Sequence, residues 1–273
     1  MLFTMPGING AVIVTGAGGA GCGRAMALRF AHDGAPLVVS DIDPAAGQRT
    51  VRAIEDNGGR AAFFRCDVRK ESQVKDLVSF AEATFGRLGV LVNNASAPHG
   101  DASIASWTDP IETDLLGAIY ATRYAIDAMK RTGGGAIVNI SSISALWHGR
   151  KTPGGFAGYD VAKAGMIRMT TRLAPLAESD SIRVNCLAPG WIATDGVRRV
   201  WDSLTPEERK ARQMPSRLIA IDEITEIVVR LATDPSLAGR VVAWWSEDEP
   251  RLIEWGDRGY RDAAALERGA IVR

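Results

Sequence analysis

The sequence of 273 residues has few cysteines, few histidines and no excess of either charge. Its three cysteines, Cys22, Cys66 and Cys186, lack metal-ligand spacing, so we expect reduced thiols in a cytoplasmic protein rather than a disulfide framework. Three scattered histidines argue against a metal centre. Lys+Arg and Asp+Glu both number 32, which gives no electrostatic case for a nucleic-acid or acidic-membrane partner.

Long hydrophobic runs are also missing. No segment approaches the ~20 apolar residues that cross a bilayer, and the N-terminus has no charged region followed by an apolar stretch. Hydrophobic residues still make up 46% of the chain and charged residues 23%, which is ample for a core. We therefore expect a soluble globular protein that acts on a small molecule.

Short apolar runs alternate with longer helical patterns along the whole chain. Strands of a parallel sheet are buried on both faces and are continuous apolar runs, joined by right-handed helical crossovers. With no linker or repeat, the pattern predicts a single doubly wound α/β domain of the Rossmann type over residues 1–273, with helices on both faces of the sheet. About seven strands are expected, at residues 11–15, 36–40, 61–66, 90–93, 136–140, 183–188 and 240–244.

Two segments interrupt this alternation. Residues 145–158 form a glycine-rich loop, and residues 194–216 are polar and helical without a strand, so both are candidates for a substrate lid or wall, residues 194–216 above all. Together with residues 96–101 they are expected to form the substrate pocket. The C-terminal extension, residues 246–273, is expected to cross a neighbouring subunit or to pack on the surface.

A glycine-rich turn follows the first predicted strand and opens a helix. Gly16, Gly18 and Gly21 fit G-x-G-x-x-G, in which missing Cβ atoms let a pyrophosphate approach N–H groups at the helix N-terminus. Asp41 ends the next strand about 20 residues later, where a carboxylate accepts hydrogen bonds from the adenosine ribose and repels a 2′-phosphate. This favours NAD over NADP, although Arg24 could serve a phosphate.

Asp43 is a second carboxylate close to Asp41. Its place directly before Pro44 is more typical of a helix N-cap than of a ribose ligand.

Tyr159 and Lys163 begin a segment of helical composition and share one helix face at i and i+4. A free tyrosine titrates near pH ~10 and has to move down by roughly 3 units, or about 4 kcal/mol, to act as a base near neutrality. A fixed lysine beside it, helped by a cationic nicotinamide, supplies such a shift.

Six motifs in order give this pair its meaning. They are TG-x₄-G-x-G at 15–23, CDV at 66–68, NNAS at 93–96, VNISS at 138–142, Y-x₃-K at 159–163 and the segment from Asn185 to Gly190. Together they resemble the short-chain dehydrogenase/reductase family over roughly residues 8–245.

The resemblance implies an NAD(P)-dependent alcohol dehydrogenase or ketoreductase. Ser142 is then expected to hold the substrate oxygen, Tyr159 to exchange the proton, and Lys163 to bind the nicotinamide ribose and lower the pKa of the tyrosine. The residues expected to bind the cofactor are Gly16, Gly18, Gly21, Cys22, Gly23, Asp41, Asp67, Val68, Asn93, Ala95, Tyr159, Lys163, Pro189, Gly190, Ile192 and Thr194.

The chain departs from the family pattern in four places. The glycine loop is one residue longer than usual. The C-terminus lacks the usual Asp-Gly-Gly. In relatives, this end of the chain and two helices, here 103–131 and 157–177, form the subunit interfaces, so the altered end leaves both a homodimer and a homotetramer open.

Asp114 occupies the position of a structural and catalytic Asn, whose backbone carbonyl holds a water of the proton relay. Asp114 could keep that role, while its charge alters the relay or pairs with a cation.

The fourth departure is a gap between Ser142 and Tyr159 that is four residues longer than usual. The extra loop carries an aromatic and cationic group that either recognises an acidic or ring-bearing substrate or is a solvated loop. This group is Trp147, His148, Arg150 and Lys151.

The function that we expect is NAD-dependent hydride transfer between nicotinamide and a secondary alcohol or ketone, tilted toward oxidation of a cyclic or aromatic alcohol. Trp147, Trp191 and Trp201 suggest a flat apolar substrate. The alternatives are an NADPH-dependent biosynthetic ketoreductase and a non-catalytic dinucleotide-binding sensor. Intact Ser142 and Tyr159 argue against the sensor.

Overall fold

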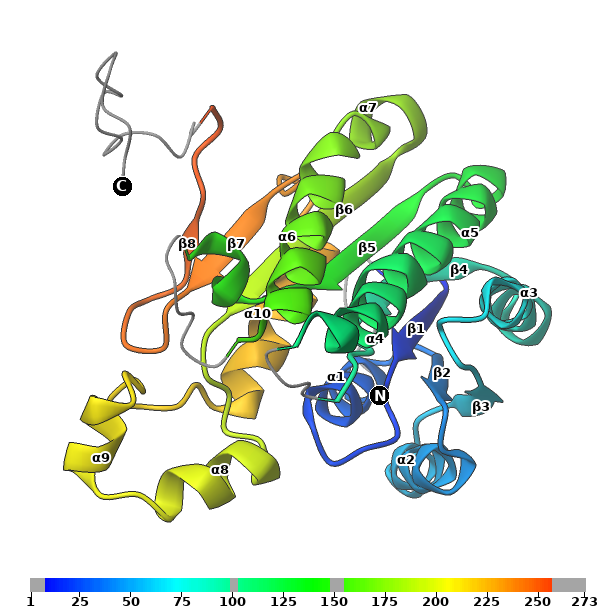
Figure 1. Cartoon of the computed structure of the whole chain (residues 1–273). Coiled ribbons are helices and arrows are strands. Elements are labelled where there is room, and N and C mark those ends of the chain that lie inside the picture. The colour runs from blue at the N-terminus through cyan, green and yellow to red at the C-terminus, as the bar shows by residue number, and fades with distance from the viewer. Residues whose placement is uncertain (1–7, 99–102, 148–154, 257–273) are drawn as a thin grey trace.

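In a computed structural model, which describes residues 8–98, 103–147 and 155–256, the chain folds around one sheet of eight strands (Figure 1). The strand order is β3-β2-β1-β4-β5-β6-β7-β8, and every pair is parallel except β7 with β8. The strands are β1 (Ala11–Thr15), β2 (Leu37–Asp41), β3 (Ala61–Arg65), β4 (Leu88–Asn93), β5 (Gly135–Ile140), β6 (Ile182–Pro189), β7 (Val241–Trp244) and β8 (Arg251–Leu252).

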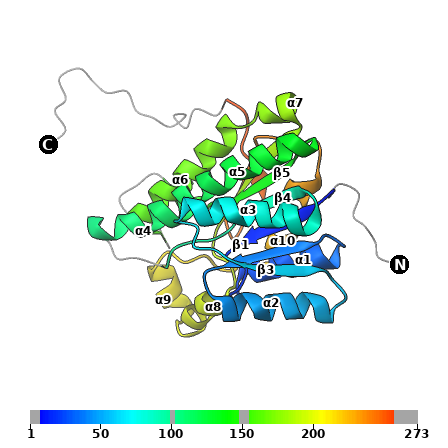
Figure 2. The ribbon, with the colours of Figure 1, turned by 90° about the vertical axis from the view of Figure 1, so that its right-hand side faces the viewer.

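Helices cover both faces of the sheet (Figure 2). Along β1, Val12 and Val14 pack in a core with α1 (Cys22–His32), α2 (Pro44–Asp56) and α10 (Ile221–Thr233), whereas Ile13 packs in the opposite core. That second core holds α3 (Glu71–Phe85) and α5 (Gly117–Thr132), and α6 (Ala157–Arg172) lies beside α5 on the same face. Successive residues of a strand point to opposite faces, so the continuous apolar strands fill two cores.

The predicted doubly wound α/β domain is therefore confirmed. All seven predicted strands are present, with ends that agree within two residues. The eighth, β8, lies inside the predicted C-terminal extension and pairs antiparallel with β7. No described helix has the length and apolarity needed to cross a membrane.

The segment before α5 is irregular. It runs through the 3₁₀ turn η1 (Ile104–Trp107), the short α4 (Thr108–Pro110) and the π-helical turn η2 (Ile111–Leu116). π turns are rare in proteins, and those that occur often lie at functional sites. The 3₁₀ turn η3 (Ile143–Leu146) follows β5 and contacts α6.

Two further helices lie away from the sheet, α8 (Asp195–Asp202) and α9 (Pro206–Ala211), and neither buries a residue (Figure 1). Thr194 caps α8, and Thr205 forms a capping box with Glu208 at α9. Local capping thus replaces core packing here. The small α7 (Leu176–Asp180) leads from α6 to β6.

Candidate active site

The carboxyl ends of β1 and β4 lie side by side because the chain crosses over between them, and such a switch point is where parallel sheets bind ligands. At the end of β1, Gly16 has a positive φ of 66°, and a Cβ on it would lie 2.9 Å from Ala95 Cα. A Cβ on Gly23 would collide with the Gly16 carbonyl. The predicted turn is therefore as tight as the glycine pattern requires.

The helix that follows offers open N–H groups. Gly21 is the N-cap residue of α1, Cys22 is its first residue, and no side chain caps this end. Unsatisfied N–H groups at a helix N-terminus attract phosphate oxygens. The predicted pyrophosphate position thus has the donors it needs.

Asp41 lies at the end of β2, facing the glycine turn. Its carboxylate accepts hydrogen bonds from the Gly18 N–H (2.7 Å) and from the Asp43 N–H (3.0 Å). As predicted, Asp43 caps α2 by accepting from Ala45 and Ala46. Arg24 does not line the cavity beside Asp41.

That cavity has a volume of about 650 Å³, within the range of small-molecule sites. Asp67 lies in its wall, paired with Arg69 through two bonds of 2.9 and 2.8 Å that hold the pKa of Asp67 below its ordinary value. Five predicted cofactor residues line the cavity, namely Gly16, Asp41, Asp67, Val68 and Ala95. The glycine turn, the open helix end and the acid at this cavity fit a dinucleotide.

Asn93 is a predicted cofactor residue whose side chain points elsewhere. Its amide donates to Thr122 Oγ1 (3.0 Å) and to Asn139 Oδ1 (2.8 Å), and Asn139 donates to Thr170 Oγ1 (2.9 Å). This buried chain of hydrogen bonds ties β4 and β5 to α5 and α6. Asn93 is not among the residues that line the cavity.

Lys163 lies at the centre of the candidate catalytic group, with its side chain 3% exposed. Its Nζ donates to the Ile140 carbonyl (2.9 Å), pairs with Asp114 Oδ2 (3.1 Å) and lies 5.3 Å from the centre of the Tyr159 ring. Burial by itself lowers the pKa of Lys163, but the Asp114 carboxylate and Tyr159 outweigh it and raise that pKa. The lysine is a fixed cation beside the tyrosine.

Ser142 follows β5 and begins η3, which contacts α6, the helix that carries Tyr159. Ser142 Oγ accepts a hydrogen bond from the Ser144 N–H (3.1 Å). Its hydroxyl hydrogen can therefore be donated to a ligand. The Phe156 ring stacks on Tyr159 with ring centres 5.5 Å apart.

The predicted nicotinamide segment continues from β6. Pro189 ends the strand, the Gly190 N–H donates to the Trp244 carbonyl (2.8 Å), and a Cβ on Gly190 would collide with Ser246. Ile192 forms an isolated bridge with Ile219 just before Thr194 begins α8.

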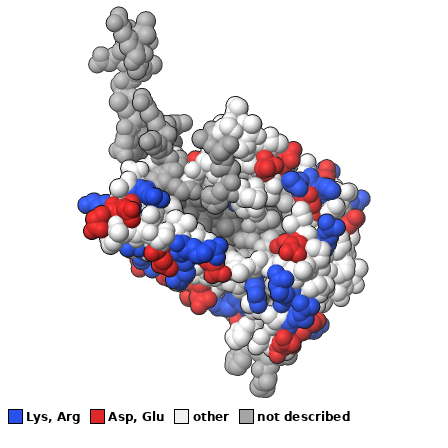
Figure 3. Space-filling model, turned by 60° about the horizontal axis from the view of Figure 1, so that its bottom comes forward, with Lys and Arg blue, Asp and Glu red and all other residues white. Residues whose placement is uncertain are grey.

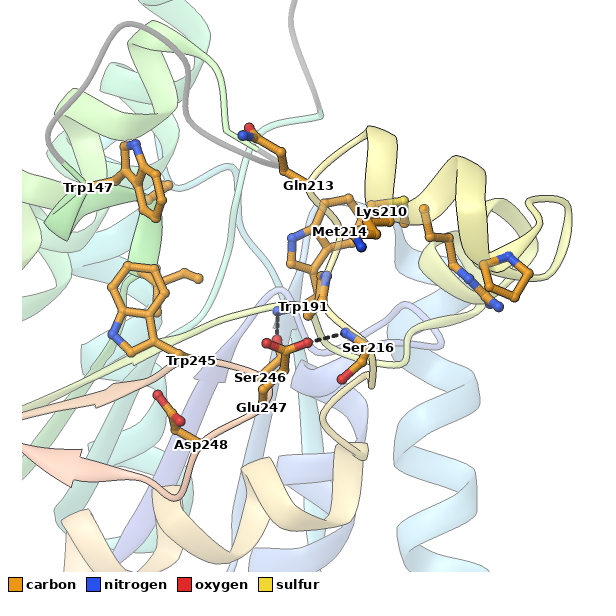
Figure 4. Close-up of a pocket in the computed structure, with 15 residues that line it drawn as sticks. Trp147, Trp191, Lys210, Gln213, Met214, Ser216, Trp245, Ser246, Glu247 and Asp248 are labelled. Carbon is orange, nitrogen blue, oxygen red and sulfur yellow. Dashed lines mark hydrogen bonds between the residues drawn. The ribbon is translucent and has the colours of Figure 1, made fainter.

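A second cavity, of about 700 Å³, lies next to η3. Trp147, Trp191 and Trp245 stand around it, and the rings of Trp147 and Trp245 meet edge to face at 5.8 Å (Figure 4). Its far wall comes from the predicted lid, including Lys210 and Met214. Trp201 does not line this cavity; it packs under Arg209, at 4.6 Å.

Trp245 and Ser246 line this second cavity, and the sequence did not point to either of them. Ser246 is buried, and its Oγ accepts a hydrogen bond from the Trp191 N–H (2.7 Å), which fixes the cavity wall (Figure 4). The available signal was their place directly after the last parallel strand, because ligands bind at the carboxyl ends of such strands.

The charged groups around the hollowed face in Figure 3 are mixed in sign, in keeping with the formal net charge of +0. Among the described residues, no cluster of histidine, cysteine and carboxylate side chains could hold a metal ion. Of the proposed aromatic and cationic loop only Trp147 is described; His148, Arg150 and Lys151 lie outside the described residues, as does His99.

Known proteins with similar sequences and structures include several dehydrogenases. The family model described as short chain dehydrogenase matches residues 10–204. The chain is 36% identical to cis-4-hydroxycyclohexanecarboxylate dehydrogenase of Sinomonas cyclohexanicum over 241 residues, which are 85% of this chain and 93% of that protein. It is 32% identical to cyclohexanol dehydrogenase of Acinetobacter sp. (strain SE19) over 232 residues, 83% of this chain and 88% of that one.

One solved structure is similar over nearly the whole chain. It is a 7α-hydroxysteroid dehydrogenase complexed with NADH and 7-oxo glycochenodeoxycholic acid, with a TM-score of 0.77 and 29% identity, covering 89% of this chain and 95% of that one.

Proposed function

Because the chain belongs to the short-chain dehydrogenase/reductase family, we propose that it catalyses NAD-dependent hydride transfer between a secondary alcohol and a ketone, with Tyr159 as acid and base. Membership makes it an oxidoreductase that acts on CH–OH groups with a nicotinamide dinucleotide. The observation that carries the finer proposal is the buried Lys163 ammonium beside the Tyr159 ring.

The chain's own residues have distinct roles in this proposal. Tyr159 takes the hydroxyl proton of the alcohol, or returns it to the ketone, while Ser142 donates a hydrogen bond to the same oxygen. Lys163, held by the Ile140 carbonyl, stabilises the tyrosinate. The bound nicotinamide supplies the hydride acceptor or donor.

Asp41 supports NAD over NADP. Its carboxylate faces the cavity where the adenosine half of the cofactor would lie, and a 2′-phosphate there would meet a negative charge. Arg69, the cation in the same wall, is already neutralised by Asp67.

The substrate that we propose carries a ring. Three tryptophans and Met214 give the second cavity flat apolar walls, and aromatic walls favour flat apolar groups. The relatives named above act on cyclohexane rings or a steroid by their names. Residues 194–216 would serve as its lid, since α8 and α9 bury no residue and α9, with the segment that follows it, supplies part of the cavity wall.

Assembly and location stay predictions. A dimer or tetramer would cover Ile119 on α5 and Val161 on α6, which are 38% and 46% exposed. A cytoplasmic location rests on three free cysteines.

Reduction of NAD⁺ and NADP⁺ over a panel of cyclic and open-chain secondary alcohols tests the proposal. We expect NAD⁺ and cyclic alcohols to be preferred, and Tyr159→Phe to lose at least about 100-fold in kcat, because proton transfer contributes that much. Full activity of Tyr159→Phe would refute the mechanism, a preference for NADP⁺ would refute the cofactor assignment, and dinucleotide binding without turnover would favour a sensor.

A further inference from the structure

Asp114 and Lys163 form an ion pair that is closed off from solvent, with side chains 0% and 3% exposed and 3.1 Å between Oδ2 and Nζ. We propose that Asp114 is a positioning residue that holds the Lys163 ammonium in place, and that its charge keeps Tyr159 protonated to a higher pH than an uncharged residue would. This deepens the proposed function and rests on Tyr159 being the base.

The surroundings of Asp114 suit a carboxylate. Oδ1 accepts from the Ala97 N–H (2.7 Å), and Oδ2 accepts from the Ser96 hydroxyl (2.6 Å) as well as from Lys163. An asparagine that kept the Ala97 bond would turn its NH₂ group toward the ammonium, which has only donors. The site is therefore built for a negative charge.

The same carboxylate links two parts of the site. Ser96 and Ala97 line the cavity assigned to the cofactor, on the loop after β4, whereas Lys163 lies on α6. The π-helical turn η2 carries Asp114 between them. Through the carboxylate of Asp114, the position of Lys163 depends on the loop that carries Ser96 and Ala97.

Among the residues that the structure describes, few other charges act on the pair. Cys186 on β6 faces Lys163, but burial raises the pKa of its thiol to about 12, so it is neutral in the working range. Glu112 on η2 and Asp109 on α4 interact with Arg69, and Asp160 adjoins Tyr159 on α6. Asp114 is thus the carboxylate in contact with Lys163 in the described part of the chain, and its charge offsets the positive field that the ammonium exerts on Tyr159.

The test is Asp114→Asn, with Glu112→Gln as a matched loss of charge on the same turn. Two readouts are needed. One is the pH profile of kcat/KM for alcohol oxidation; the other is the near-ultraviolet titration of Tyr159 in cofactor-free protein, taken as the difference from the same protein carrying Tyr159→Phe.

We expect Asp114→Asn to move the Tyr159 titration and the rising limb of the profile down by on the order of one pH unit, because a nearby negative charge is removed, and Glu112→Gln to move neither by a comparable amount. An unchanged Tyr159 titration in Asp114→Asn overturns the inference. Full activity of Tyr159→Phe overturns the proposed function instead, so the two failures can be told apart.

If Asp114→Asn does not fold, the double variant Asp114→Asn with Lys163→Met decides. Removing one partner leaves a buried unpaired charge, and removing both relieves it. Recovery of thermal stability in the double variant supports the pairing, and equal instability of both variants contradicts it.

Discussion

Asp41 is the residue on which the proposed preference for NAD depends. Replacing it by alanine removes a charged acceptor for ribose hydroxyls, and such bonds are worth roughly 1.5–3 kcal/mol. We therefore expect Asp41→Ala to lower kcat/KM for NAD⁺ by about 10- to 100-fold and to leave NADP⁺ unchanged or improved, measured by initial rates with both cofactors.

Asp43 provides the control for this prediction. It caps α2 two residues away, so Asp43→Ala should cost about 1 kcal/mol of stability but keep the ratio between the two cofactors. Equal losses for NAD⁺ and NADP⁺ in Asp41→Ala would mean that the carboxylate only supports the glycine turn, through its bond to Gly18.

At the scale of elements, the segment after β7 belongs to the site. Ser246→Ala leaves the half-buried Trp191 N–H without its hydrogen-bond partner, and an unpaired donor of this kind costs roughly 1–3 kcal/mol of stability. We expect lower stability in urea unfolding and a raised KM, because the wall at Trp191 loosens. Ser236→Ala, at an exposed serine of the turn before β7, should stay within about 0.5 kcal/mol of the parent; an equal effect of the two changes would contradict the role given to Ser246.

The same elements show what a sequence can reveal. The seven longer strands could be predicted because they are mostly apolar, and all but the half-buried β3 are buried on both faces. β8 could not, since Arg251 and Leu252 are exposed and the strand has only two residues. The π turn η2 has ordinary helical composition, so its residues carry no sign of the wider turn.

The candidate site divides in a similar way. Glycines and an acid at fixed spacing predicted residues that line the first cavity, because their pattern is local to one strand, turn and helix. The sequence left open that Asp114 pairs with a cation, but it did not identify Lys163 on α6 as the partner, nor Ser246 as the partner of Trp191. Contacts of this kind are set by tertiary packing and leave no periodic trace.

For the whole molecule, buried thiols predict a loss of stability at alkaline pH. Burial raises the pKa of Cys66 and of Cys186 from 9.0 to about 12, so above pH 9.0 the unfolded chain loses these protons and the folded chain keeps them. Their stabilising contribution is complete below 9.0 and is lost as the pH rises toward 12. The loss is on the order of 1 kcal/mol per thiol by pH ~10.

Urea unfolding at pH ~8 and pH ~10 measures this loss. A variant with both Cys66→Ala and Cys186→Ala should show a flatter dependence over this range, whereas Cys22→Ala, at a thiol whose pKa is about 11, should keep most of it. The same slope in the double variant would assign the alkaline loss to other titrating groups.

The π turn has a consequence for comparing relatives. A π turn holds one more residue than an α turn, so deleting one residue between Pro110 and Gly117 would close it to an α turn and shift the residues inside the turn by one position relative to α6. An aspartate at position 114 would then point away from Lys163 although its chemistry was unchanged. In an alignment, the insertion and the aspartate have to occur together before a relative can be expected to share the ion pair.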